Sequence, residues 1–135
     1  VENAGLLAFL QRTDPSRLRQ LLLTGYRLTA ESLRALGRLP WLSRLNRLEL
    51  TFSIEGNPWT ALADWPSLTE LTDLQLSACE LLSGGATALA ASPMLAGVRF
   101  LDLSYNDIGD DGVMALARSP HLISLHFLDL TVSRA

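Results

Sequence analysis

One apolar spacing returns five times along this 135-residue chain and constrains its fold more than any other feature. The pattern is Leu-x-x-Leu-x-Leu, with valine once in the first place, and it begins at residues 18, 45, 71, 98 and 125. A fixed period of 26 or 27 residues is typical of repeat proteins, in which each repeat is a short strand plus a return segment. The sequence therefore predicts a single domain over residues 1–135, with a partial repeat at 1–17 and a truncated one from 125.

The alternation within each run predicts strands whose second and third leucines face a core. These strands are expected at residues 19–24, 46–51, 72–77, 99–104 and 126–131. Helical return segments are expected at residues 3–10, 30–39, 86–91 and 112–117. The second repeat should have a shorter or 3₁₀ segment near 59–64, because Gly56 and Pro58 interrupt the loop Ile54–Trp59. A proline five residues before four of the strands should end each preceding helix: Pro40, Pro66, Pro93 and Pro120.

The phrase LDLSYNDIGDDGVMALA, from Leu101 to Ala117, resembles a repeat of the ribonuclease-inhibitor-like class of leucine-rich-repeat proteins, as found in many bacterial proteins. The resemblance extends over nearly the whole chain. It implies an α/β fold, an open curved solenoid with parallel strands on the concave side and helices on the convex side. It also implies protein–protein recognition by the concave surface, and it does not imply an enzyme. The family usually has Asn or Cys three residues after the last strand leucine, where this chain has Tyr26, Ser53, Cys79, Asn106 and Ser133.

Composition argues against several classes of protein. Apolar residues make up 48% of the chain but never run unbroken for the ~18 residues that a membrane helix needs, so no membrane span is expected. There is no basic-then-apolar leader, and localisation stays open, with the cytoplasm favoured. All eleven basic residues are arginine, which suggests a GC-rich bacterial genome and makes a Walker phosphate loop impossible.

Charge is unevenly distributed along the chain. Residues 1–47 contain eight arginines and three acidic residues, for 8 − 3 = +5, whereas residues 48–135 contain three and eleven, for 3 − 11 = −8. A linear array of repeats would therefore have a basic and an acidic end. Nucleic-acid binding is disfavoured, because the net charge is negative and the arginines are not concentrated on the predicted strand face.

No catalytic, cofactor-binding or metal-binding residue is predicted. Cys79 stands where the family has a buried turn residue, which favours a structural role over a reactive thiol. His121 and His126 lack the further ligands of a metal site. The loop Asp107–Gly112 lacks the glutamate that ends a calcium loop, and its acidic residues instead favour the start of a helix.

The outward strand positions are the best candidates for a functional surface, because they line up across stacked repeats and leave the core leucines untouched. The aligned columns are Gln20, Arg47, Asp73, Phe100 and Phe127; Leu22, Glu49, Gln75, Asp102 and Asp129; Thr24, Thr51, Ser77, Ser104 and Thr131; and Gly25, Phe52, Ala78, Tyr105 and Val132. The hydroxyl column is interpreted as strand and turn chemistry. Aromatic residues beside acidic ones have the composition of an interface core. The predicted protein-binding residues are Arg47, Glu49, Phe52, Asp73, Gln75, Phe100, Asp102, Tyr105, Phe127 and Asp129.

Two questions stay open at this level. Trp41, Trp59 and Trp65 either fill the space left by the irregular second repeat or form an exposed convex patch. The function is either non-enzymatic recognition of an unidentified protein partner or, alternatively, assembly within a longer repeat array. Neither end has a recognisable polar cap, so we expect the ends to be covered by the rest of a longer chain or by self-association with another copy.

Overall fold

Strands and helices alternate along the chain in the computed structural model, which describes residues 4–12, 17–52 and 58–132. The strands are β1 (Gln20–Leu28), β2 (Arg47–Phe52), β3 (Asp73–Gln75), β4 (Phe100–Asp102) and β5 (Phe127–Asp129). They form one sheet in chain order, and each neighbouring pair is parallel. The predicted mixed α/β class with parallel strands is therefore confirmed.

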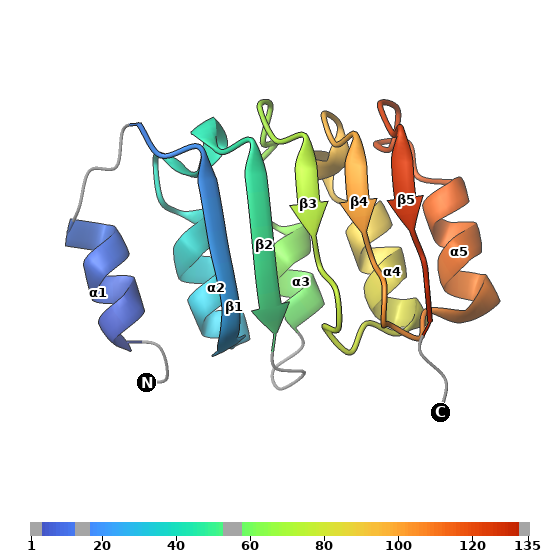
Figure 1. Ribbon diagram of the computed structural model, residues 1–135, viewed down its shortest axis with the longest axis horizontal. Coiled ribbons are helices and arrows are strands. Elements are labelled where there is room, and N and C mark those ends of the chain that lie inside the picture. The colour runs from blue at the N-terminus through green and yellow to red at the C-terminus, as the bar shows by residue number, and fades with distance from the viewer. Residues whose placement is uncertain (1–3, 13–16, 53–57, 133–135) are drawn as a thin grey trace.

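The helices lie on one side of this sheet (Figure 1). They are α1 (Ala4–Arg12), α2 (Ala30–Gly37), α3 (Pro58–Ala63), α4 (Ser83–Ala90) and α5 (Gly109–Ala117), with 3₁₀ turns η1 (Leu42–Arg44) and η2 (Pro93–Leu95). Helices α2 to α5 stand side by side behind the strands, and α1 stands next to α2 (Figure 1). Among the described residues, the other face of the sheet carries no helix.

The strands differ in length from the prediction. β3, β4 and β5 have three residues each, against six expected, and Ala78 and Tyr105 soon afterwards turn the chain with φ values of +54° and +57°. β1 is longer, and its pairing with β2 shifts between Leu23 and Leu28, so Phe52 pairs with Leu28. The predicted alignment of Phe52 with Gly25 is therefore wrong, because extra residues of β1 interrupt the regular register.

A helix follows each of the first four strands, as predicted, but the bounds of these helices differ from the prediction. α3 is an α-helix of six residues, so the second repeat has a shorter segment as expected, but not a 3₁₀ one. Residues 53–57, which include most of the predicted irregular loop, lie outside the described part of the chain, as does Ser133. The four prolines stand three residues beyond the last residues of α2, α3, α4 and α5. They therefore occupy the turn after each helix.

The core lies between the sheet and the helices and consists mainly of leucine. In β2, β3 and β4 the predicted inward leucines are fully buried, as Leu48, Leu74 and Leu101 show. The equivalent Leu128 of β5 is 37% exposed, because no strand among the described residues pairs with the outer edge of β5. The apolar spacing therefore predicts the core of the central repeats better than that of the last one.

The three tryptophans are buried, so of the two alternatives the interior one is confirmed and the exposed convex patch is excluded. Trp65 Nε1 donates a hydrogen bond to the carbonyl oxygen of Leu33 at 2.7 Å. Its ring lies against Gly37, where a Cβ atom would come within 2.6 Å of the indole. Trp59 packs on Gly85 in the same way, with 2.9 Å to such a Cβ atom. Each of these rings therefore needs a glycine on the neighbouring helix.

Candidate functional site

The uncovered side of the sheet is here called the strand face, and it consists of the outward residues of β1 to β5 (Figure 1). Two rows of side chains run across it in register. They are Gln20, Arg47, Asp73, Phe100 and Phe127, and Leu22, Glu49, Gln75, Asp102 and Asp129. Two of the predicted columns are thus confirmed as neighbours in space, and they bring together eight of the ten predicted site residues.

The other two predicted site residues lie at strand ends. Phe52 is the last residue of β2, and its side chain is not among those described. Tyr105 lies in the turn after β4 and is 58% exposed. In the hydroxyl column, the Oγ atoms of Ser77 and Ser104 are 3.1 Å apart. This bond between neighbouring repeats agrees with the interpretation of that column as strand and turn chemistry.

A cluster of charges occupies the middle of the strand face. Arg47 Nη2 lies 3.7 Å from Glu49 Oε2, and Arg47 Nε lies 3.8 Å from Asp73 Oδ2. Gln75 Nε2 donates to the other carboxylate oxygen of Asp73 at 3.2 Å. The two ion pairs are too long for hydrogen bonds, and Arg47 Nε is buried without a hydrogen-bond partner. Arg47 therefore partly neutralises both carboxylates by charge alone.

An aromatic pair dominates the face over β4 and β5. The ring centroids of Phe100 and Phe127 are 6.3 Å apart and the rings are tilted by 41°, a favourable arrangement for two aromatic rings. The rings are nevertheless exposed, by 49% and 54%. A shallow hollow of about 180 Å³ lies beside them, lined by Asp73, Gln75, Phe100, Leu101, Asp102 and Phe127. Exposed apolar rings with polar neighbours are typical of a surface that another molecule covers.

Two carboxylates accompany these rings. Asp102 accepts a hydrogen bond from the backbone N–H of Ser104 at 2.8 Å, and Asp129 accepts one from Thr131 at 2.9 Å. The backbone N–H and the side chain of Thr131 hold the pKa of Asp129 below its ordinary value of 3.8. Neither carboxylate forms an ion pair with any described residue. Asp129 is therefore ionised at neutral pH.

The turn positions that follow the strands connect neighbouring repeats. Asn106 is buried, and its Oδ1 accepts hydrogen bonds from the backbone N–H groups of Cys79 and Leu81 at 2.9 and 3.0 Å. Cys79 is fully buried, and its Sγ lies 3.3 Å from the carbonyl oxygen of Leu50. The predicted structural role of Cys79 is confirmed. The spacing identified both positions but not the bonds that they make.

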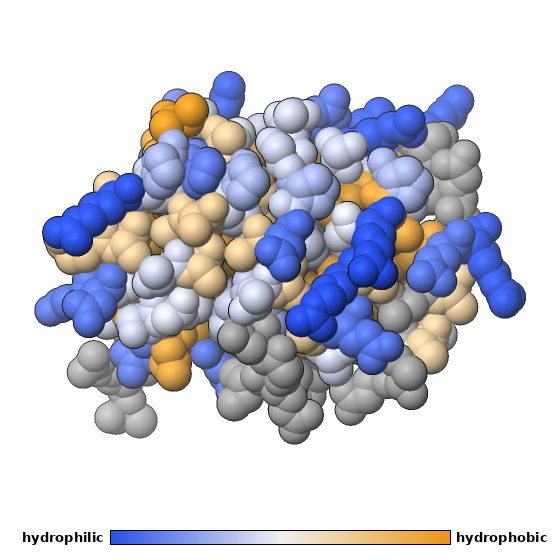
Figure 2. All heavy atoms as spheres, turned by 180° about the vertical axis from the view of Figure 1, so that it is seen from behind, coloured by the Kyte–Doolittle hydropathy of each residue, from blue (hydrophilic) through white to orange (hydrophobic). Residues whose placement is uncertain are grey.

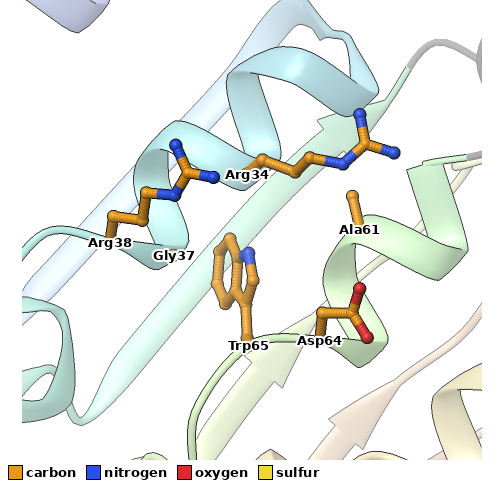
Figure 3. Close-up of a pocket in the computed structure, with 6 residues that line it drawn as sticks. All are labelled: Arg34, Gly37, Arg38, Ala61, Asp64 and Trp65. Carbon is orange, nitrogen blue, oxygen red and sulfur yellow. The ribbon is translucent and has the colours of Figure 1, made fainter.

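The helix-covered side has a different character. Blue, polar side chains are prominent over α2, whereas paler ones lie over α4 (Figure 2). A cavity of about 240 Å³ opens between α2 and α3, lined by Arg34, Gly37, Arg38, Ala61, Asp64 and Trp65 (Figure 3). Arg34 extends across the cavity towards α3, whereas Arg38 stays over α2 (Figure 3). The two guanidinium groups therefore do not converge on one point.

The histidines and the acidic loop that were considered as metal ligands do not form a cluster among the described residues. His126 is exposed, with Nδ1 2.7 Å from the carbonyl oxygen of Ser124, and His121 is partly buried. Asp110 and Asp111 lie in the first turn of α5, as expected. In the part of the chain that the structure describes, no three His, Cys, Asp or Glu side chains are grouped so that they could hold a metal ion. No described helix has the length and apolarity to cross a membrane.

Comparison with known proteins identifies one repeat directly. Residues 98–117, which include β4, the turn with Asn106 and α5, match a family model described as leucine-rich repeat. No curated protein matches the chain. The family match supports the leucine-rich-repeat interpretation and indicates a protein-interaction module, a class that is typically non-enzymatic.

Proposed function

We propose that this chain is a non-enzymatic recognition module of the ribonuclease-inhibitor-like leucine-rich-repeat class and that its strand face binds a protein. In this proposal the repeats form an open, curved solenoid with the strand face on its concave side. The family match at residues 98–117 supports the class. The observation that carries the site is the pair of half-exposed rings, Phe100 and Phe127, on the face that the described helices leave uncovered. The all-arginine basic composition favours a bacterial origin.

The proposed contact surface combines exposed aromatic rings with charged neighbours. The aromatic pair and Tyr105 supply rigid apolar area, and Asp102 and Asp129 form the row next to the pair. The proposed residues are Arg47, Glu49, Phe52, Asp73, Gln75, Phe100, Asp102, Tyr105, Phe127 and Asp129. The eight of them that lie in the two rows of the strand face alternate with the buried leucines, so their replacement should alter binding with little effect on folding.

Affinity purification tests this function with two matched double variants. Phe100→Ala with Phe127→Ala removes the rings, whereas Val113→Ala with Met114→Ala removes exposed apolar side chains of α5. If the rings are hot spots, each should contribute about 2 kcal/mol or more to binding, so the first variant should lose a partner that the second retains. Retention of every wild-type partner by the first variant, with its fold intact, would refute the proposal.

The open edge of β5 favours assembly as a second candidate function. Leu128 is 37% exposed and Ile123 is 76% exposed beside an edge that no described strand pairs with. Such an edge can pair with another chain, and a second copy could cover it. Sedimentation over a wide concentration range tests this alternative. A monomer at every concentration, unchanged by salt, would exclude it.

A further inference from the structure

We propose that the strand face receives a cationic, arginine-bearing segment of its partner, seated on Phe100 and Phe127. This inference rests on the proposed function, because it names the chemistry of what the same surface binds. It depends on the charge that the face leaves unneutralised and on the position of the rings beside that charge.

The strand face carries an excess of negative charge. Its ten residues include one arginine and four carboxylates, for 1 − 4 = −3. Arg47 lies between Glu49 and Asp73, so one positive charge offsets half of the two negative charges over β2 and β3 and leaves 1 − 2 = −1 there. Asp102 and Asp129 form no ion pair with a described residue. The unneutralised charge is therefore concentrated over β4 and β5, where the rings lie.

The rings and carboxylates form two similar pairs on neighbouring strands. Phe100 and Asp102 are two residues apart on β4, and Phe127 and Asp129 have the same spacing on β5. Residues two apart in a strand point to the same face at a separation of roughly 7 Å. A cation placed over either ring, within about 6 Å of its centroid, therefore comes close to a carboxylate as well.

Arginine matches this arrangement better than lysine does. Its planar guanidinium stacks on an aromatic ring and can donate two parallel hydrogen bonds to one carboxylate. Ser104 donates a backbone hydrogen bond to Oδ1 of Asp102, and Thr131 donates one to Oδ1 of Asp129. An ionised carboxylate has about four lone-pair sites, so each of these groups can still accept hydrogen bonds from a ligand. A lysine ammonium would retain the charge attraction and lose the planar stacking.

The size of the hollow beside the rings suits one side chain of a larger partner better than a whole small-molecule ligand. Its volume of about 180 Å³ is below the roughly 300–1,000 Å³ of pockets that enclose small-molecule ligands. The surrounding face extends across five strands. Both features suit a polypeptide that lies along the face and inserts one or two side chains.

Peptide titration followed by NMR tests the inference. The probes are three octapeptides in which serine alternates with arginine, lysine or glutamate. We expect the arginine peptide to shift the signals of Phe100, Phe127 and Asp102. It should bind about two- to five-fold more tightly than the lysine peptide, because only the guanidinium combines planar stacking with two parallel hydrogen bonds to a carboxylate. The glutamate peptide should leave these signals unchanged.

Matched variants separate this site from general attraction to an acidic protein. Asp102→Asn should weaken binding of the arginine peptide several-fold. Asp110→Asn makes the same change in net charge on exposed α5 and should change affinity less than two-fold. Phe127→Leu keeps an apolar side chain but removes the aromatic ring. Its affinity for the arginine peptide should fall about two- to five-fold.

The contrary outcomes are equally specific. The inference would be overturned if Asp102→Asn and Asp110→Asn weakened binding of the arginine peptide equally. It would also be overturned if the NMR signals of the strand face shifted with the glutamate peptide and not with the arginine peptide. Face signals that shift with protein concentration in the absence of peptide would show that a second copy is the occupant, and would also overturn it. A failure of this kind leaves the proposed function standing if the double alanine variant at Phe100 and Phe127 still loses its partner. That function fails separately when this variant retains every partner.

Discussion

Replacement of Asn106 by alanine tests how the repeats are connected. The Asn106 Oδ1 atom accepts hydrogen bonds from the N–H groups of Cys79 and Leu81, and its Nδ2 donates to the carbonyl oxygens of Leu76 and Leu103 at 2.9 and 3.0 Å. The side chain is only 4% exposed, so water does not replace these bonds. One amide therefore satisfies backbone groups of two successive repeats.

The cost follows from the donors that the substitution leaves without a partner. The backbone N–H groups of Cys79 and Leu81 would both be orphaned in a buried turn. Each buried donor without an acceptor costs about 1–3 kcal/mol, so the two together cost about 2–6 kcal/mol. That is a large part of the roughly 5–15 kcal/mol by which native domains are stable. A loss of about 3 kcal/mol in a chain of this size lowers Tm by roughly 10 °C.

Urea denaturation followed by circular dichroism measures the change. Asn46→Ala is the matched control, because Asn46 is exposed and its side chain forms no hydrogen bond with a described residue. The free energy of unfolding of this variant should stay within about 0.5 kcal/mol of wild type. The same result for Asn106→Ala would refute the reasoning. It would mean that the turn amides find other partners, and that this side chain does not connect the repeats.

The other predictions concern packing and ionisation. Leu101→Ala should cost about 2–5 kcal/mol by opening a cavity in the core, and Leu128→Ala at the sheet edge should cost less than about 2 kcal/mol; equal costs by urea denaturation would contradict the strand arrangement. Gly37→Ala should destabilise the chain by about 1–3 kcal/mol, because its Cβ would meet an indole at 2.6 Å; an unchanged Tm would contradict this packing. Because the folded-state pKa of Asp129 is lowered, its contribution to stability is present above pH 3.8 and is lost as pH falls through the folded pKa. Thr131→Val should raise that pKa towards 3.8 in an NMR titration, and an unchanged value would show that the side chain of Thr131 has no part in it.

The sequence predicts the central repeats well because two regularities coincide there. A constant period places equivalent residues side by side, and the alternation of each strand decides which of them point outward. These two facts are enough to place Phe100 beside Phe127 and Asp102 beside Asp129. The candidate surface over β4 and β5 is therefore largely predictable without coordinates.

The features that the sequence does not predict depend on contacts between distant residues. The extra residues of β1 are not visible in the leucine spacing, which continues unchanged, so the pairing of Phe52 with Leu28 was unforeseen. The burial of Trp65 depends on the absence of a side chain at Gly37, on the preceding helix. Composition alone left that tryptophan with two possible environments, and only the packing of α2 against α3 distinguishes them.

Separation of stability from recognition is a physical consequence of this architecture. Leu101 is fully buried, while Phe100 and Asp102 on either side of it point to the opposite face of the sheet. The residue that holds the strand in place and the residues proposed to contact a partner are thus adjacent in sequence but opposite in direction. The outward positions can therefore differ from repeat to repeat at little cost in stability. Here they differ in charge and polarity. Ion pairs of Arg47 partly offset the carboxylates of β2 and β3, whereas exposed rings on β4 and β5 lie beside carboxylates that form no ion pair with a described residue.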